Sequence, residues 1–422
     1  MYGLVLEGGG AKGAYQVGAV KALFEMGFKF NAITGTSIGA INGAFLALNK
    51  FDELYNIWEE AEILNVVDTD KELLSKILDL EFKSKDIPKI IEYVIKTIED
   101  GGFDINPLRQ MLIDNINEEE LRESKIDFGL VTVSFTDFKP IEVFIKDIPK
   151  GKLIEYIIAS ASLPIFKLDK IDGKKFIDGG FYDNMPVNLI SQKDIKDIIV
   201  IGIEGTGRKR KIKRDDLNII KIAPSKKISR TIETDPEIIR EGMQYGYLDA
   251  YRVIEKYNGT RYYIKTDKDE DFFINKILKL SDKKIKRLYK LFNIEMPINK
   301  RILVEVILPI LGKILKLDEE CSYVELFISL NEKIAEYFEV DDMKLYQYNE
   351  FNKMLIEKTN FNEVIKFTYK YKYIPFAYLP QQIEVLPKST VKKILKEFFI
   401  IMYIEEGKSQ LLTTEVASLK KL

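Results

Sequence analysis

The chain has 422 residues with 64 basic and 66 acidic side chains, a formal net charge of −2 that is ordinary for a globular protein. It contains no histidine, which excludes Ser-His-Asp and Cys-His catalytic sets, a HExxH zinc site and an imidazole proton shuttle. Its single cysteine, Cys321, excludes an internal disulfide and a cysteine-based metal cluster within one chain. Any chemistry must therefore use hydroxyls, carboxylates, amines and backbone amides.

The first 205 residues alternate between short apolar runs and helical patterns. The runs that predict strands are residues 4–6, a run ending at 34–35, 128–135, 141–145, 175–177 and 198–201. Segments 14–26, 38–48 and 152–161 predict helices, and charged helical segments fill roughly 51–123 with a break at Gly101 and Gly102. Such alternation predicts an α/β fold with a parallel sheet and helices on both of its faces.

The second half of the chain has a different character. Residues 1–205 carry 23 basic and 34 acidic side chains (net −11), and the remaining 41 and 32 give residues 206–422 a net charge of +9. After a basic stretch at 205–214, we predict a strand at 219–222, a helix at 236–257, and Lys-rich amphipathic helices with almost no strand signal from about 268. We therefore expect a catalytic domain over 1–260 and a helical accessory region over 261–422.

A glycine-rich loop, Gly8-Gly9-Gly10-Ala11-Lys12-Gly13, lies between the first predicted strand and helix. Its backbone amides and the helix dipole suit an anion or a developing oxyanion. Gly8, Gly10 and Gly13 also satisfy the dinucleotide fingerprint G-x-G-x-x-G. That interpretation needs an acidic ribose partner, and none occurs between Glu25 and Asp52. A Walker A loop is excluded because Gly13, not Ser or Thr, follows Lys12.

The segment Gly35-Thr36-Ser37-Ile38-Gly39 fits the pattern G-x-S-x-G at a strand end that opens a helix. This is the context of a nucleophile elbow, in which Ser37 occupies a sharp turn and the flanking glycines let strand and helix pack closely. Without histidine, a carboxylate is the available base. Asp100 and Asp178 both precede two glycines, but Asp100 closes a helical segment, whereas Asp178 follows a strand, where open α/β sheets place ligand sites.

The glycine loop, the G-x-S-x-G segment and Asp178-Gly179-Gly180, in this order, resemble the three signatures of the patatin-like phospholipases. Residues 159–166 (Ala-Ser-Ala-Ser-Leu-Pro-Ile-Phe) are similar to the block that precedes the Asp loop in that family. Residues 183–187 (Asp-Asn-Met-Pro-Val) resemble the continuation of the loop. The resemblance covers about 205 residues and implies a three-layer α/β/α domain followed here by a helical C-terminal region.

The resemblance also implies a mechanism and a set of roles. Ser37 would attack the ester carbonyl, Asp178 would act as base without a histidine, and the amides of Gly9, Gly10 and Gly13 would hold the oxyanion with Lys12 nearby. The motifs require no metal and no organic cofactor. Glu7 and Lys12 stand where the family more often has Asp and Arg. Gly8, Gly35, Gly39, Gly179 and Gly180 would support the motifs.

We therefore expect a serine lipid acyl hydrolase of the phospholipase A type that acts on membrane phospholipids. The alternatives are a non-catalytic lipid-binding scaffold of the same fold and a nucleotide-binding protein that uses the glycine loop. An unperturbed Asp, with a pKa of about 3.9, removes a serine proton poorly. We expect Asp178 to be partly desolvated for this reason, which would raise its pKa.

Six of the seven residues at 208–214 are basic, namely Arg208, Lys209, Arg210, Lys211, Lys213 and Arg214. We expect a solvated, mobile loop or a contact with anionic lipid headgroups, and not nucleic-acid binding, because no nucleic-acid motif accompanies the run. The N-terminus lacks the pattern of a signal peptide, so we expect a cytoplasmic protein. The basic run at 208–214 adds the expectation of a peripheral contact with the membrane. The lipid headgroup, the cleaved acyl position and the oligomeric state stay open.

Overall fold

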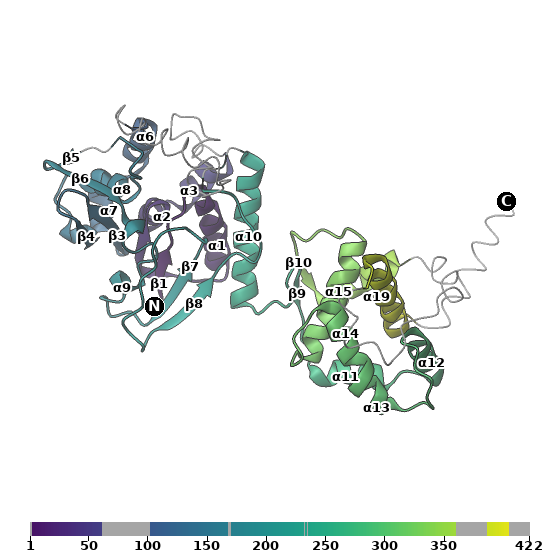
Figure 1. Cartoon of the computed structure of the whole chain (residues 1–422). Helices are drawn as coiled ribbons and strands as arrows, with labels where there is room; N and C mark the ends of the chain where they lie inside the picture. Colours follow the sequence, from purple (N-terminus) through teal and green to yellow (C-terminus); the bar gives the residue numbers. More distant parts are fainter. Residues whose placement is uncertain are drawn as a thin grey trace. The chain divides into compact units, whose positions relative to one another are not determined.

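The structure is a computed structural model that describes residues 2–60, 102–167, 170–231, 233, 235–359 and 386–404. The chain forms two compact units, Met1–Glu255 and Lys256–Leu422 (Figure 1). Asp100, the second candidate carboxylate in the sequence, lies outside the described residues.

The first unit contains an eight-stranded sheet. Five strands run parallel in the order β3-β2-β1-β7-β8, namely β1 (Tyr2–Leu6), β2 (Phe30–Thr36), β3 (Asp127–Ser134), β7 (Asp197–Ile201) and β8 (Asn218–Ile222). The predicted all-parallel sheet is wrong at one edge, where β4 (Lys139–Phe144), β5 (Lys170–Ile171) and β6 (Lys174–Asp178) are antiparallel to their neighbours. Connections of four residues after β3 and two after β5 are too short for a parallel crossover, so these neighbours pair antiparallel.

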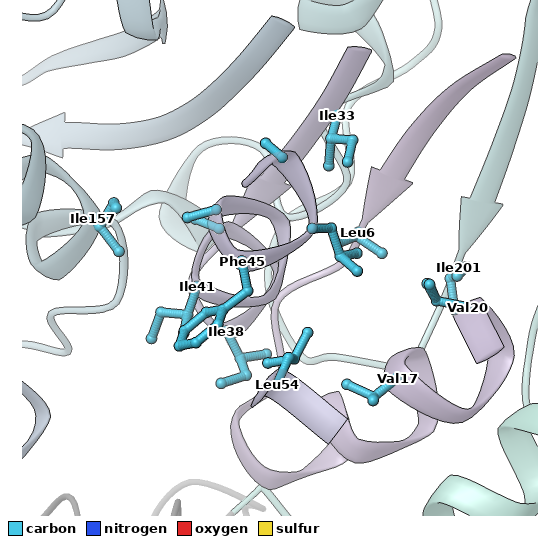
Figure 2. Close-up of a cluster of buried hydrophobic side chains, with 14 of the residues drawn as sticks. Leu6, Val17, Val20, Ile33, Ile38, Ile41, Phe45, Leu54, Ile157 and Ile201 are labelled. Carbon is cyan, nitrogen blue, oxygen red and sulfur yellow. The ribbon is translucent and has the colours of Figure 1, made fainter. Parts of the chain in front are cut away.

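Apolar side chains are buried on both faces of the parallel strands. Along β1, Leu4 and Leu6 join one core and Val5 joins another, because alternate side chains point to opposite faces. The first core lies between the sheet and α1 (Gly13–Glu25), α2 (Ile38–Ala47), α3 (Phe51–Glu59), α8 (Leu153–Ser160) and α10 (Pro236–Ile254). Figure 2 shows part of it, with Phe45 and Ile41 of α2, Leu54 of α3 and Val17 of α1 in one cluster. The second core lies under α9 (Val187–Ile190), which completes the three layers.

Strand β3 brings the two predicted catalytic segments together. Strand β4 pairs with residues 129–134 of β3, a range that overlaps the residues paired with β2 and those paired with β6. Strand β4 must therefore occupy one edge of β3 by itself. Strands β2 and β6 must therefore share the other edge, with Thr36 opposite Val131 and Asp178 opposite Thr132. They run in opposite directions, so their carboxyl-terminal ends meet head to head. Ser37, which follows Thr36, lies at this junction.

Among the residues that the structure describes, the first unit also contains α6 (Asn106–Asn115), α7 (Glu118–Glu123) and the 3-10 turns η1 (Gly10–Lys12), η4 (Ile145–Asp147) and η5 (Gly179–Phe181). Among the described residues, no helix is long and apolar enough to cross a bilayer.

The second unit is largely helical and has a core of its own. Its described parts contain the helices α11 (Glu270–Leu278), α12 (Asp282–Leu291), α13 (Lys300–Ile302), α14 (Leu308–Leu315), α15 (Tyr323–Tyr337), α16 (Tyr348–Lys358) and α19 (Lys388–Tyr403). A π-helical turn, η6 (Leu303–Ile307), precedes Pro309, which has no N–H for the helical ladder. Two short parallel strands, β9 (Tyr263–Lys265) and β10 (Leu345–Gln347), pair in this unit. The sequence did not predict β10, because three residues are too few for a strand pattern.

Candidate active site

Ser37 occupies a strained turn between β2 and α2. Its φ of 56° and ψ of −125° are unusual for a residue with a side chain, and such strain is concentrated at functional sites. A side chain at Gly35 would collide with the Gly39 carbonyl, and one at Gly39 with the Leu6 carbonyl. The strand–turn–helix setting expected around Ser37 is therefore present, with glycine where the backbones cross.

The carboxyl group of Asp178 interacts with the Ser37 side chain, which favours the charged form of the carboxyl. Its Oδ1 also accepts the Gly180 amide at 2.7 Å, and the Asp178 amide donates to the Ser162 carbonyl at 2.7 Å. These bonds fix the carboxylate at the end of β6, with one oxygen bound to the loop that follows it. A serine side chain beside an oriented carboxylate is an arrangement in which the carboxylate could accept the serine proton.

Burial makes Asp178 a stronger base than a free aspartate. Desolvation raises the pKa of this carboxyl to about 6, although the interaction with Ser37 and the hydrogen bond from Gly180 favour the charged form and act in the opposite direction. The side chain is 4% exposed. The structure thus has the desolvation that the sequence analysis expected, and its effect on the pKa has the expected sign.

The glycine loop lies against the elbow. A Cβ at Gly8 would lie 3.0 Å from the Cβ of Ser37, so only glycine lets the loop approach this closely. Gly10 has a φ of 60°, and a side chain there would collide with the Thr231 carbonyl. The loop is thereby held beside the hydroxyl of Ser37.

The amides of this loop have different partners. The Gly8 amide donates to the Asn184 carbonyl at 3.1 Å, and the Ala11 amide donates to the Thr231 carbonyl at 2.8 Å. The Gly13 amide bonds to carbonyls of the preceding turn. The amides of Gly9 and Gly10 have no hydrogen-bond partner within the described parts of the chain. Of the three amides expected to hold an oxyanion, these two remain open to a ligand.

Lys12 and Gly13 have structural contacts. The Lys12 ammonium donates to the Glu204 carbonyl at 3.2 Å. A Cβ at Gly13 would lie 2.6 Å from Cγ1 of Ile38, so this glycine lets α1 pack against α2. Both residues shape the loop through these contacts.

Ser160 is a site residue to which the sequence analysis gave no role. Its Oγ accepts the backbone amide of Ser37 at 3.0 Å and donates to the Val131 carbonyl at 2.7 Å. The side chain is fully buried, so these two groups have little access to water. Ser160 thus ties the elbow to β3, beside the point where Asp178 pairs with that strand. The only sequence signal for it was its place in the block at 159–166.

Glu7 is a second residue whose role the sequence did not reveal. It is fully buried, yet Oε2 accepts the Ile203 amide at 2.6 Å and Oε1 accepts the Gly205 amide at 3.1 Å. Its Oε1 also lies 2.7 Å from Nζ of Lys209. A buried carboxylate bonded in this way fixes the chain after β7 against the glycine loop.

The basic segment, residues 208–214, for which the sequence predicted a solvated, mobile loop, is hydrogen-bonded to its neighbours. The Arg208 amide donates to the Gly180 carbonyl at 2.8 Å, and the Arg208 carbonyl accepts the Asn184 amide at 2.6 Å. These bonds attach the segment to the loop that carries Asp178. Three of its cations pair with acidic groups: Lys209 with Glu7, Arg210 with Glu142 and Arg214 with Asp216.

The other three cations of the basic segment, Arg208, Lys211 and Lys213, are exposed. They have no carboxylate within ion-pair distance among the residues that the structure describes. Asp183, in contrast, is fully buried beneath the segment, and its burial raises its pKa to about 6, with Nη1 of Arg210 3.9 Å from Oδ2.

Comparisons with known proteins relate the first half of this chain to one family. Residues 4–190 match the family model described as patatin-like phospholipase. The chain is 30% identical over 209 residues to patatin-like phospholipase domain-containing protein 7 of Rattus norvegicus, across 47% of this chain and 13% of the relative. It is 26% identical over 203 residues to lysophospholipase NTE1 of Mycosarcoma maydis, across 48% of this chain and 10% of the relative.

These matches concern one domain, since the aligned part is 13% or less of either relative. The crystal structure of VipD from Legionella pneumophila is similar at a TM-score of 0.39 and 16% identity, over 97% of this chain and 93% of that one. A TM-score this low adds nothing to the assignment, which rests on the family match and the sequence relatives. The family that residues 4–190 of this chain resemble is therefore the patatin-like phospholipases.

Proposed function

We propose that the protein is a serine lipid acyl hydrolase of the phospholipase A type that uses Ser37 as nucleophile and Asp178 as base. The observation that carries the proposal is the meeting of the ends of β2 and β6, which places Ser37 beside the buried Asp178 carboxyl so that the two side chains interact. The chain has no histidine, so a carboxylate is the base within reach of the serine. The names of the relatives, a phospholipase domain protein and a lysophospholipase, support a lipid ester as substrate.

In the first half of the reaction, Ser37 Oγ attacks the ester carbonyl while its proton passes to Asp178. The carbonyl oxygen becomes an oxyanion, which the open amides of Gly9 and Gly10 can stabilise. The C–O bond then breaks, and the leaving lysolipid alkoxide takes the proton from Asp178. The product bound to the enzyme is an acyl ester of Ser37.

In the second half, Asp178 removes a proton from water, and the resulting hydroxide attacks the acyl ester. The fatty acid leaves, and Asp178 returns the proton to Ser37 Oγ. One water is consumed for each ester cleaved. In this scheme the chain's own groups supply the nucleophile, the base and the oxyanion donors. The scheme therefore requires no metal or organic cofactor.

The test is covalent labelling of the full chain with a fluorophosphonate probe, which reacts with activated serines. We expect wild type to be labelled and Ser37→Ala to lose the label. Ser191→Ala is the matched control, because this buried serine donates to its own helix at the Asn188 carbonyl and should keep the label. Ser160→Ala is unsuitable as a neutral control, because Ser160 holds the amide of Ser37.

The same assay separates the alternatives. A lipid-binding scaffold would bind phospholipid vesicles without being labelled at Ser37. A nucleotide-binding protein would be protected from heat by nucleotides, and would also remain unlabelled. The second alternative is weakened because the amides of Gly8 and Ala11 are already bonded within the protein, which leaves fewer amides for phosphates.

We also infer that the protein acts as a peripheral protein at an anionic membrane. Arg208, Lys211 and Lys213 are exposed, and each basic residue near such a surface contributes roughly 1 kcal/mol of attraction. Replacing these three residues by Gln should weaken binding to vesicles that contain phosphatidylserine. Labelling of Ser37 by the fluorophosphonate in solution is the control, and it should be unchanged if the site is intact. Equal binding of the triple variant and wild type would contradict this inference.

A further inference from the structure

The turn between β3 and β4, residues 135–138, exposes two aromatic side chains. Phe135 is 48% exposed and Phe138 is 80% exposed, the highest value among the large apolar side chains that the structure describes. Their ring centroids lie 5.7 Å apart, so they form one apolar tip. Exposed apolar residues are common singly, whereas a paired tip of this kind is typical of an interaction site.

This turn is built to hold its shape. The Asp137 amide donates to Ser134 Oγ at 3.1 Å, which closes the turn on itself. On the neighbouring strand, the Lys175 amide donates to Thr136 Oγ1 at 2.9 Å, and the Lys175 carbonyl accepts the Phe135 amide at 2.8 Å. Phe138 has a φ of 56°, a conformation that a bulky residue rarely adopts. The fold thus holds the two rings in water at a cost in backbone strain.

The tip lies beyond the end of the sheet at which Ser37 lies. Thr36 pairs with Val131, and Phe135 is four residues further along β3, about 13 Å past that level at 3.3 Å per residue. Strand β6 runs beside this extension and ends at Asp178. Figure 1 shows β3, β4, β5 and β6 grouped at one lateral edge of the sheet. A surface met by the tip would therefore lie about 13 Å beyond the level of Ser37, on the side of the sheet toward which the carboxyl end of β2 points.

The charges around the tip are mostly positive. Lys139, Lys170 and Lys175 are exposed and have no carboxylate within ion-pair distance in the described ranges. The two acidic residues of these turns already face lysines. Asp137 is 2.8 Å from Lys174, and Asp172 is 3.7 Å from Lys152. An apolar tip with exposed lysines beside it complements a lipid surface with anionic headgroups.

We propose that residues 135–138 form a membrane anchor that inserts Phe135 and Phe138 into an anionic bilayer. The anchor delivers the carboxyl end of the sheet to its substrate, and in that respect the inference rests on the proposed function. The exposed lysines attract the anionic headgroups, while the phenyl groups of Phe135 and Phe138 move from water into the membrane interface.

The test is flotation of the full chain with vesicles of phosphatidylcholine containing increasing phosphatidylserine. Wild type should bind more as the anionic fraction rises and less as salt rises. Phe135→Ser with Phe138→Ser should lower the partition coefficient at least about tenfold, given the apolar area that the rings withdraw from water. Phe138→Trp should keep the binding, because tryptophan favours the membrane interface. Ile113→Ser is the control, since Ile113 is 52% exposed on α6, outside the tip.

Flotation measures membrane binding and does not need turnover. The proposed function is tested separately, by hydrolysis of a short-chain soluble ester by the wild-type chain. Loss of flotation in the serine double variant, with retention in Phe138→Trp and Ile113→Ser, supports the anchor even if no ester is cleaved. Equal flotation of wild type and the double variant would overturn it. Failure of wild type to bind any vesicle would also overturn it and would leave the tip as a contact for a protein partner.

Discussion

At the scale of single residues, the buried carboxyl of Asp178 determines how activity depends on pH. Only its charged form can accept the Ser37 proton, and burial raises its pKa to about 6. The value of kcat/KM should therefore rise with pH and level off above about 7. A pH–rate profile with a soluble ester measures this. A midpoint near 4, the value of a solvated aspartate, would contradict the role given to burial.

Ser160 provides a second prediction at this scale. Ser160→Ala leaves the Ser37 amide and the Val131 carbonyl without a partner in a buried place, which should lower the free energy of unfolding by about 1–3 kcal/mol. Displacement of the elbow should lower kcat by on the order of tenfold to a hundredfold with little change in KM.

The matched control for Ser160 is Ser162→Ala. The Ser162 hydroxyl donates to Ile158 within its own helix region and makes no contact with the Ser37 amide. Denaturant unfolding and steady-state kinetics of both variants give the comparison. If Ser162→Ala lowers kcat as much as Ser160→Ala does, the bond to the Ser37 amide has no special role.

The sequence predicted Ser37, Asp178 and the glycine loop, because each lies in a local motif whose chemistry can be stated from neighbouring letters. Ser160 and Glu7 act through partners far away in sequence, at separations of 123 and up to 202 residues. No local pattern encodes such contacts. The amides left open in the glycine loop could not be predicted either, since the partners of its other amides include Asn184 and Thr231 on distant segments.

At the scale of elements, the close crossing of α1 and α10 supports the site, because α1 begins directly after the glycine loop. A side chain at Gly246 of α10 would collide with the Tyr15 carbonyl of α1, whereas one at Gly242 would meet only the Cβ of Ala14, at 3.9 Å. Gly246→Ala should therefore lower the free energy of unfolding by about 1–3 kcal/mol.

Gly242→Ala is the matched control on the same helix, and it should raise the free energy of unfolding by about 0.5–1 kcal/mol, because alanine favours the helix more than glycine does. Urea unfolding of the two variants gives both numbers. Equal effects of the two substitutions would show that the helices do not depend on close backbone contact at Gly246.

The elements themselves were predicted well where local pattern and packing agree. The helices α1, α2 and α8 and the strands β1, β3 and β7 lie within a few residues of their predicted positions. The predicted parallel direction of β4 and β6 was wrong, since apolar spacing reveals a strand but not its partner. That direction matters for the site, as only an antiparallel β6 brings its carboxyl end against that of β2.

At the scale of the whole molecule, the two units have separate hydrophobic cores. All the groups placed in the proposed reaction, Ser37, Asp178 and the glycine loop, belong to the first unit. A chain of residues 1–260 should therefore fold and be labelled by a fluorophosphonate at the rate of the full chain, as measured by circular dichroism and by the labelling time course. A folded but unlabelled fragment would show that the second unit completes the site.

The central claim is that a fatty acyl group is transferred to Ser37 with Asp178 as base. It is tested most directly by quenching the enzyme during turnover of a phospholipid and mapping the acyl group by peptide mass spectrometry. The account predicts an acyl adduct on the peptide that contains Ser37 in wild type, and none in Ser37→Ala or Asp178→Asn. An adduct on another residue, or undiminished acylation in Asp178→Asn, would contradict it.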